Sequence, residues 1–144
     1  ERADYRMESH AARIARVLLD ELAQMPREQF NLPIRIIAGE TVRESDGLAL
    51  SSRNRYLSKG ERRLAPQLFD ALKMIRASAR AGQHEYARLE MAAIQQLMQA
   101  GFSPDYISVR RQADLAAPEP ADAGLVVLGA ARLGVTRLID NLEI

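Results

Sequence analysis

The sequence contains no cysteine and no tryptophan, and aromatic residues make up only 5% of it. The absence of cysteine excludes a disulfide framework, a cysteine-based zinc site and a cysteine nucleophile. With so few aromatic side chains, the core must be built from leucine, isoleucine, valine and alanine. No apolar run approaches the roughly 20 residues that a membrane-spanning helix needs, and no signal-peptide pattern opens the chain. We therefore expect a cytoplasmic protein with no membrane partner.

The chain also lacks an excess of charge of either sign, because its formal net charge is +1. Its apolar fraction of 47% is that of a globular protein. A near-neutral protein has no general field to attract nucleic acid, and the arginine pairs at 62–63 and 110–111 have no aromatic residues interleaved with them. We expect no nucleic-acid partner, and any anion site must be local.

The familiar catalytic motifs are missing as well. The only two histidines, His10 and His84, are far apart and have no ligand spacing, so we expect surface or capping roles for them and no metal site. There is no G-x-x-x-x-G-K-S/T loop and no G-x-G-x-x-G fingerprint. The sequence shows no recognisable motif for a catalytic triad of serine, histidine and aspartate. Residue chemistry therefore leaves an anion-binding loop as the main functional candidate.

The first part of the chain resembles the second half of a βαβ unit. Apolar residues recur at helical spacing over residues 7–23, and a polar connection leads to a β-branched run at 34–38 that suits a buried strand. Ser58 and Glu61 then have the spacing of a capping box. The helix that they open is interrupted by Pro66, which should kink it or split off a short first turn. The residues predicted on its core face are Leu64, Leu68, Leu72, Ile75 and Ala79.

The second part predicts a small α+β unit. Residues 85–100 form an amphipathic helix, with Gly101 at its C-terminal cap and Phe102 placed for the accompanying apolar contact. Three methionines, Met74, Met91 and Met98, are expected to fill gaps in the core. Residues 105–111 alternate, residues 124–131 are continuously apolar as in a central strand, and residues 136–144 give a last strand. Two helices should therefore cover one face of an antiparallel sheet of three strands.

Between these two parts lies a polar stretch flanked by apolar anchors, residues 46–57. Ser51, Ser52, Arg53, Asn54 and Arg55 supply two hydroxyls, an amide and two guanidinium groups within five residues. Hydroxyl and backbone donors together with a guanidinium fork form the inventory that proteins use to hold phosphates. The alternative is an ordinary solvated loop before a helix cap. The long apolar anchors on both sides favour the first interpretation.

The text of this stretch resembles the pantothenate synthetase family (pantoate–β-alanine ligases). The matching segments are N-L-P-I at 31–34, T-V-R-E-S-D-G-L-A-L-S-S-R-N-R-Y-L-S at 41–58, and R-L-I-D-N at 137–141. The resemblance covers roughly four-fifths of the chain, from residue 31 to its end. It implies an enzyme that uses ATP with Mg²⁺ to activate pantoate as an adenylate, which the amine of β-alanine then attacks. It also implies a cytoplasmic homodimer.

The resemblance assigns candidate roles to individual residues. Ser51, Ser52 and Arg53 match the positions that contact the ATP phosphates in the family. Val42 and Leu50 match positions that border the adenine or bind it through the backbone. Asp4 matches the aspartate of a family segment G-E-K-D-x-Q-Q, although Ala3 stands where that segment has lysine and Met7 where it has glutamine.

The fold implied is the end of a Rossmann-like nucleotidyltransferase domain (residues 1–46, with 1–30 divergent), a phosphate loop or hinge (47–57) and a C-terminal lid domain (58–144). The family's H-x-G-H motif is absent from this sequence, so we expect no catalytic residue in this chain and no activity from it alone. The first residue is not methionine, which is compatible with a fragment or a processed product. The alternative is a stand-alone binding or dimerisation module, with the same lid fold, that pairs through an exposed sheet edge.

Overall fold

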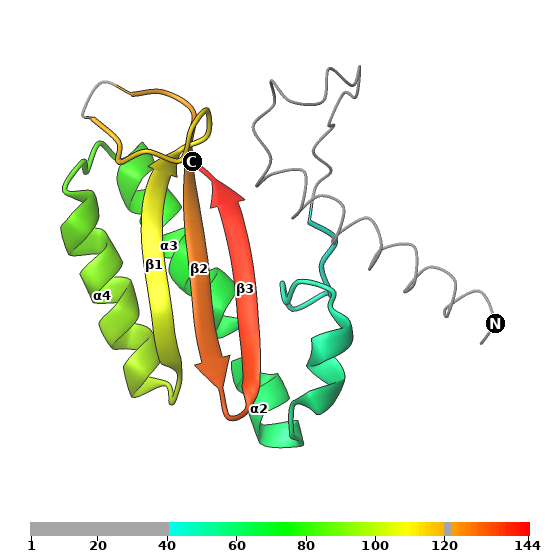
Figure 1. Cartoon of the computed structure of the whole chain (residues 1–144). Coiled ribbons are helices and arrows are strands. Elements are labelled where there is room, and N and C mark those ends of the chain that lie inside the picture. Colours follow the sequence, from blue (N-terminus) through cyan, green and yellow to red (C-terminus); the bar gives the residue numbers. More distant parts are fainter. Residues whose placement is uncertain (1–40, 120–121) are drawn as a thin grey trace, which may run out of the picture. The chain divides into compact units, whose positions relative to one another are not determined.

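A computed structural model describes residues 41–119 and 122–144, which belong to one compact unit that extends from residue 40 to the C-terminus. The predicted helix at 7–23 and strand at 34–38, His10, and the Rossmann-like part of the predicted fold lie outside these described residues. The C-terminal part of that prediction is confirmed. Two long helices cover one face of a three-stranded antiparallel sheet (Figure 1).

The first helical elements of the unit are a 3₁₀ turn, η2 (Ser52–Tyr56), and a short helix, α2 (Lys59–Leu64). The predicted capping box opens α2: the Ser58 hydroxyl accepts from the Glu61 N–H, and the Glu61 carboxylate accepts from the Ser58 N–H. Pro66 splits off this first helix as predicted, and α3 (Gln67–Arg80) follows. The prediction that Leu64 lies on the core face was wrong. Leu64 is exposed because α2 ends there, before the core-facing helix begins.

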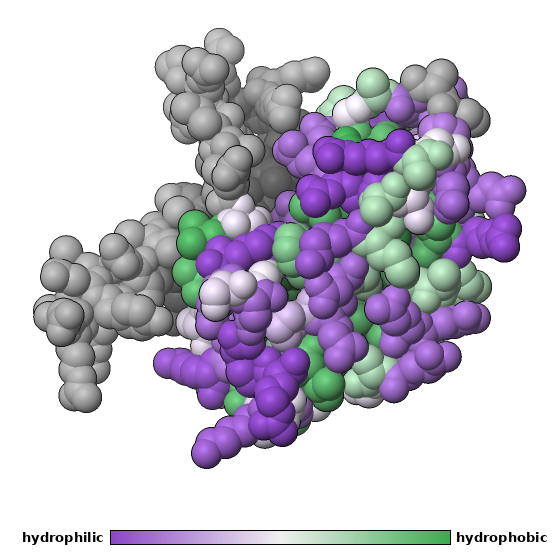
Figure 2. Space-filling view, turned by 180° about the vertical axis from the view of Figure 1, so that it is seen from behind, coloured by the Kyte–Doolittle hydropathy of each residue, from purple (hydrophilic) through white to green (hydrophobic). Residues whose placement is uncertain are grey.

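Helix α4 (Tyr86–Gln99) ends in the predicted cap, in which the Phe102 N–H donates to the Leu97 carbonyl at 3.0 Å. Phe102 is buried, as expected. The prediction that the three methionines fill the core was wrong. Met74, Met91 and Met98 are 41%, 59% and 61% exposed. Helices α3 and α4 each pack on the sheet and on each other with one face, so the opposite face remains in water, and hydrophilic side chains predominate on that side (Figure 2).

The sheet has the order β1 (Ser103–Arg111), β2 (Leu125–Leu133) and β3 (Thr136–Glu143). The apolar β2 is central, as its continuous hydrophobic run predicted, and a two-residue turn joins it to β3. Gly129 lies in the middle of β2, where an added Cβ would be 2.9 Å from Ile107 and 3.1 Å from Leu72. The glycine therefore lets α3 approach the sheet closely.

The core between helices and sheet is aliphatic, as the composition required. Its largest fully buried side chains are Leu72, Ile75, Leu97, Val109 and Val127. At the β1 edge, the Glu90 carboxylate of α4 accepts from the Val109 N–H at 2.6 Å, which satisfies an edge donor that would otherwise be open to another strand. None of the helices in the described part of the chain has the length and apolarity needed to cross a membrane.

Candidate functional site

Residues 42–50 form a small hairpin that immediately precedes the predicted phosphate loop in the sequence. The Leu50 N–H donates to the Val42 carbonyl and the Glu44 N–H to the Leu48 carbonyl, both at 2.9 Å. The turn is closed by Asp46, whose carboxylate accepts from the Leu48 N–H at 3.2 Å. Gly47 has a φ of +91°, which side chains of L-residues rarely adopt. An Asp-Gly turn is a sequence signal for such a reversal, so the hairpin follows from local chemistry.

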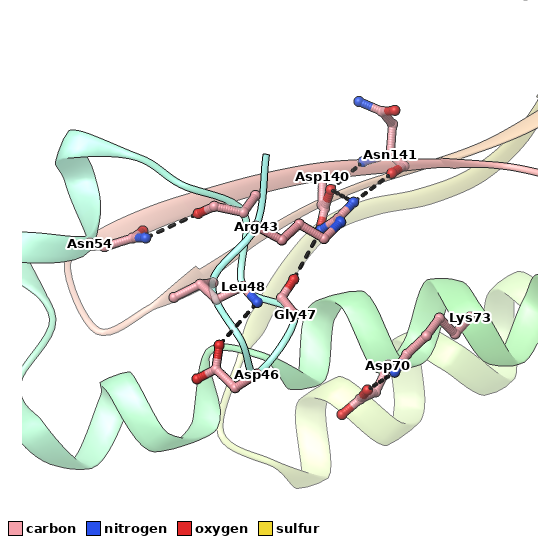
Figure 3. Close-up of polar contacts among 10 residues, drawn as sticks. Arg43, Asp46, Gly47, Leu48, Asn54, Asp70, Lys73, Asp140 and Asn141 are labelled. Carbon is pink, nitrogen blue, oxygen red and sulfur yellow. Dashed lines mark hydrogen bonds and ion pairs between the residues drawn. The ribbon is translucent and has the colours of Figure 1, made fainter. Parts of the chain in front are cut away.

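The first anchor of this hairpin is Arg43. Its guanidinium makes two hydrogen bonds to the Asp140 carboxylate in β3, at 2.7 and 2.9 Å (Figure 3). It also donates to the carbonyls of Gly47 and Asn141, and it lies 3.6 Å from the centre of the Phe69 ring. The hairpin is thereby tied to both the sheet edge and α3.

The second anchor is Arg62 in α2, which pairs with Asp46 at 2.6 Å and with Glu44 at 2.8 Å. The hydrogen bond from Arg62 lowers the pKa of Asp46 from its ordinary value. The hydrogen bonds to Asp46 and Glu44 raise the pKa of Arg62. All three side chains remain partly exposed, so this anchor is an interaction at the surface. The arginine pair at 62–63 was considered as a nucleic-acid contact. Arg62 of this pair is instead bonded to two acidic residues of the same unit.

The predicted phosphate loop follows the hairpin as the 3₁₀ turn. Ser51 caps it, because its hydroxyl accepts from the Arg53 N–H at 3.2 Å. Asn54 fastens the turn back to the hairpin through its amide, which donates to the Ala49 carbonyl at 3.0 Å. The turn is therefore held to the hairpin by the Asn54 side chain, and its residues Ser52 and Arg53 remain exposed.

That outer surface carries the predicted phosphate contacts. The side chains of Ser51, Ser52 and Arg53 are consecutive and all exposed. Within residues 41–119 and 122–144, the Arg53 guanidinium has no hydrogen-bond or ion-pair partner, and neither does the Ser52 hydroxyl. The structure therefore brings together on a single turn two hydroxyls and one guanidinium that is unpaired within the described part of the chain.

The two predicted adenine neighbours lie beside each other in the hairpin. Val42 and Leu50 form the pair next to the Arg43–Ala49 bridge, and the Leu50 N–H donates to the Val42 carbonyl. Opposed residues of an antiparallel pair present their side chains on the same face. Their side chains are 66% and 58% exposed, which leaves an apolar pair open to a ligand. Asp4, the remaining predicted site residue, lies outside the described residues.

The described residues offer no ligand set for a metal ion. Within 41–119 and 122–144, no group of three or more histidine, cysteine, aspartate or glutamate side chains is placed to hold one. Of the acids near the loop in sequence, Glu44 and Asp46 are engaged with Arg62, and Glu61 accepts from the Ser58 N–H. The described residues therefore contain no cluster of protein ligands that could hold a magnesium ion on its own.

Sequence reasoning missed Arg43 and Asp140, although both lie in the segments that carried the family resemblance. Their roles depend on a pairing between residues separated by 97 positions. No periodicity or local spacing in one sequence reports such a pair. Covariation between the two positions in an alignment is the signal that would have found it.

Comparison with family models matches residues 19–143 of the chain to the family described as pantoate-beta-alanine ligase. The chain belongs to this family. The match confirms the resemblance and extends it from residue 31 to residue 19.

Solved structures agree with the family assignment. Two crystal structures of pantothenate synthetase from Thermus thermophilus are 36% identical to the chain, with TM-scores of 0.71 and 0.72, and the match covers 89% of this chain and 44% of theirs. A pantoate-beta-alanine ligase from Francisella tularensis, complexed with beta-gamma ATP and beta-alanine, is 23% identical over 80% of this chain, with a TM-score of 0.54. This last likeness concerns the fold alone. The chain spans less than half the length of the solved structures it matches.

Proposed function

We propose that the chain supplies the ATP-phosphate contacts and the lid of a ligase that condenses pantoate with β-alanine through a pantoyl adenylate. One observation carries the proposal. Ser51, Ser52 and Arg53 lie exposed on one turn, and the Arg53 guanidinium has no partner in the described part of the chain. Family membership supports ATP as the ligand proposed for this turn.

The chemistry asked of the turn is electrostatic. In the first step a carboxylate oxygen of pantoate attacks the α-phosphorus of ATP, and the bond to the β-phosphate oxygen breaks, so that pyrophosphate leaves with the charge. The guanidinium of Arg53 would stabilise that charge, and the hydroxyls of Ser51 and Ser52 would orient the phosphate oxygens. In the second step the amine of β-alanine displaces AMP and forms the amide. Positioning and charge stabilisation account for most of what a protein contributes to such transfers.

The apolar pair of Val42 and Leu50 supports the other half of nucleotide recognition. An aromatic base buries its faces against aliphatic side chains, and backbone groups beside it read its edge. Val42 and Leu50 would border the adenine in this way, with Asp4 as a further ATP contact. We retain the domain layout of residues 1–46, 47–57 and 58–144 as part of the proposal, together with a cytoplasmic homodimer.

Magnesium enters the proposal only as the ion that accompanies ATP, because the described residues offer it no ligand set. The chain covers 44% of each Thermus thermophilus synthetase and carries no H-x-G-H motif. We therefore expect this chain by itself to be inactive. Incubation with ATP, pantoate and β-alanine should release no AMP above background. Turnover at the rate of an ordinary ligase would contradict this part of the proposal.

The phosphate role is tested by titrating the chain with ATP and with AMP, following the amide signals of residues 50–55 by NMR. Arg53→Ala should weaken ATP binding about tenfold, since a hydrogen bond to a charged group contributes roughly 1.5–3 kcal/mol. Its effect on AMP should be smaller, because AMP lacks the β- and γ-phosphates. Arg63→Ala is the matched control, since Arg63 is an exposed arginine on the neighbouring α2. Equal ATP affinity in wild type and Arg53→Ala would overturn the proposal.

A further inference from the structure

We infer that Arg43 and Asp140 are a positioning pair that sets where the Ser51–Arg53 turn stands relative to the sheet, and hence how well it grips a nucleoside triphosphate. The inference rests on the proposed function for its ligand. It adds Arg43 and Asp140 to the site as residues that do not themselves contact the nucleoside triphosphate. Their effect is transmitted through the hairpin of residues 42–50.

The pair is placed at a fixed point of the fold. Asp140 is opposite Gly129 in the β2–β3 register, and the Cβ direction at Gly129 points to Ile107 and Leu72. Asp140 therefore extends from the helix-covered face of an edge strand. Its side chain is only 4% exposed, and that of Arg43 is 18% exposed. A carboxylate in this setting requires a partner, and the guanidinium fork of Arg43 supplies one with both nitrogens.

Further hydrogen bonds from the Arg43 guanidinium fix its orientation between the hairpin and β3. One nitrogen also donates to the Gly47 carbonyl in the hairpin turn at 3.1 Å, and the other to the Asn141 carbonyl in β3 at 3.2 Å (Figure 3). The same guanidinium stacks on Phe69 of α3. It thus joins the hairpin backbone, the strand backbone and a helix side chain at once. A lysine carries the same charge but cannot reproduce this planar arrangement.

A short chain of hydrogen bonds leads from Arg43 to the turn. Arg43 lies opposite Ala49 in the hairpin, between the hydrogen bonds that join Glu44 to Leu48 and Leu50 to Val42, and the Ala49 carbonyl accepts from the Asn54 amide in the 3₁₀ turn. The next pair, Val42 and Leu50, ends immediately before Ser51. A change in the tilt of the hairpin is therefore passed to the turn. Misplacement of a binding group by about 1 Å can cost up to a hundredfold in an enzyme.

The experiment uses Asp140→Asn, with Asp105→Asn as its matched control. Asp105 pairs with Arg137, which lies on the same strand as Asp140, at 2.6 Å. This control pair lies at the surface and, within the described residues, makes no hydrogen bond or ion pair with residues 42–50. Both variants replace one strand aspartate of an arginine pair by its amide. Arg43→Lys provides the conservative variant, which keeps the charge and loses the fork.

Two readouts separate positioning from stability. Amide hydrogen exchange at Glu44 and Leu50 reports whether the hairpin is held, and exchange at Val127 reports the core. In Asp140→Asn we expect hairpin exchange to accelerate about tenfold and ATP affinity to fall about tenfold, with a smaller acceleration of exchange at Val127. Arg43→Lys should lie between this variant and wild type. Asp105→Asn should leave both the hairpin and ATP binding unchanged.

The outcomes distinguish this inference from the proposed function. Unchanged hairpin exchange and ATP affinity in Asp140→Asn would overturn the inference and leave the proposed function intact. An equal loss of ATP affinity in Asp105→Asn would also overturn it, because general destabilisation would then account for the effect. If wild type shows no ATP binding at all, the proposed phosphate role fails. The inferred effect on the nucleotide fails with it, whatever the exchange data show.

Discussion

Arg43 and Arg53 stand ten residues apart in the chain, and the fold uses them in opposite ways. Arg43 is mostly buried, forks onto Asp140, reaches two carbonyls and stacks on Phe69. Arg53 is exposed, and its guanidinium contacts no partner within the described residues. A guanidinium that is bonded inside the unit helps to hold the fold, whereas one that has no partner within the described residues can be proposed as a ligand contact. The comparison shows that an arginine count in a loop says little until each donor has been accounted for.

The two arginines are also interdependent. The turn that carries Arg53 is fastened by Asn54 to the hairpin that Arg43 anchors. Preorganised donors bind better than mobile ones, because less ordering entropy is lost on binding. The internal contacts of Arg43 therefore support the external contact proposed for Arg53.

The largest expected difference between Arg43 and Arg53 is in the free energy of unfolding that is lost when each is replaced by alanine. Arg43→Ala leaves the Asp140 carboxylate nearly buried without its partner, so the free energy of unfolding should fall by about 3 kcal/mol. Arg53→Ala, which removes an exposed side chain, should change it by less than about 0.5 kcal/mol. Urea denaturation of both variants checks this. Similar losses in the two variants would show that the structural division between the arginines is wrong.

The second effect concerns the turn that receives Arg43. Gly47→Ala places a Cβ 2.9 Å from the Phe69 ring at a φ of +91°. We expect a loss of about 2 kcal/mol in the free energy of unfolding, since L-residues are strained in this conformation. Gly60→Ala is the control, because Gly60 lies in α2 and an added Cβ there would meet only the Ser58 hydroxyl, at 3.9 Å. That substitution should stabilise the protein by about 0.5–1 kcal/mol. Thermal unfolding of both variants measures the difference.

A third, smaller effect separates the two serines on the Arg53 side of the comparison. The Ser51 hydroxyl caps the 3₁₀ turn, so Ser51→Ala should lower both ATP affinity and stability, the latter by roughly 0.5–1 kcal/mol. Ser52→Ala should lower ATP affinity alone. Denaturation and ATP titration on the same samples give the two numbers. A stability loss in Ser52→Ala equal to that in Ser51→Ala would contradict the assignment of the cap.

The smallest effect is a pH dependence at the capping box between the turn and α2. Hydrogen bonds from Ser58 hold the pKa of Glu61 below its ordinary value of 4.5. The ionised form is therefore favoured in the folded state, and its contribution is present above 4.5 and disappears as the pH falls through the lowered pKa. Wild type should lose more stability than Glu61→Gln as the pH is lowered through this window. Denaturation midpoints that fall equally with pH in wild type and in Glu61→Gln would contradict the prediction.

Local structure was predictable because its causes are local. The Ser58–Glu61 box, the break at Pro66 and the cap at Phe102 each depend on residues a few positions apart. In β1 the alternating sequence corresponds to side chains that are buried mainly on one face of the strand. In β2 the continuous apolar run corresponds to side chains that are buried on both faces. The predictions for Met91 and Met98 failed because a helix pattern shows which residues are apolar but not how many faces are covered. Only the packing of α4 against a single layer decides that.

The sequence by itself determined the order of the elements after residue 58, the aliphatic core, the family resemblance and the residues of the exposed turn. Each follows from composition, period or a contiguous motif. The tertiary structure decided which arginine is paired and which has no partner within the described residues, because Asp140 lies 97 positions from Arg43 and meets it only when β3 closes the sheet. A side chain's availability depends on its neighbours in space, and a single sequence shows only its neighbours in the chain.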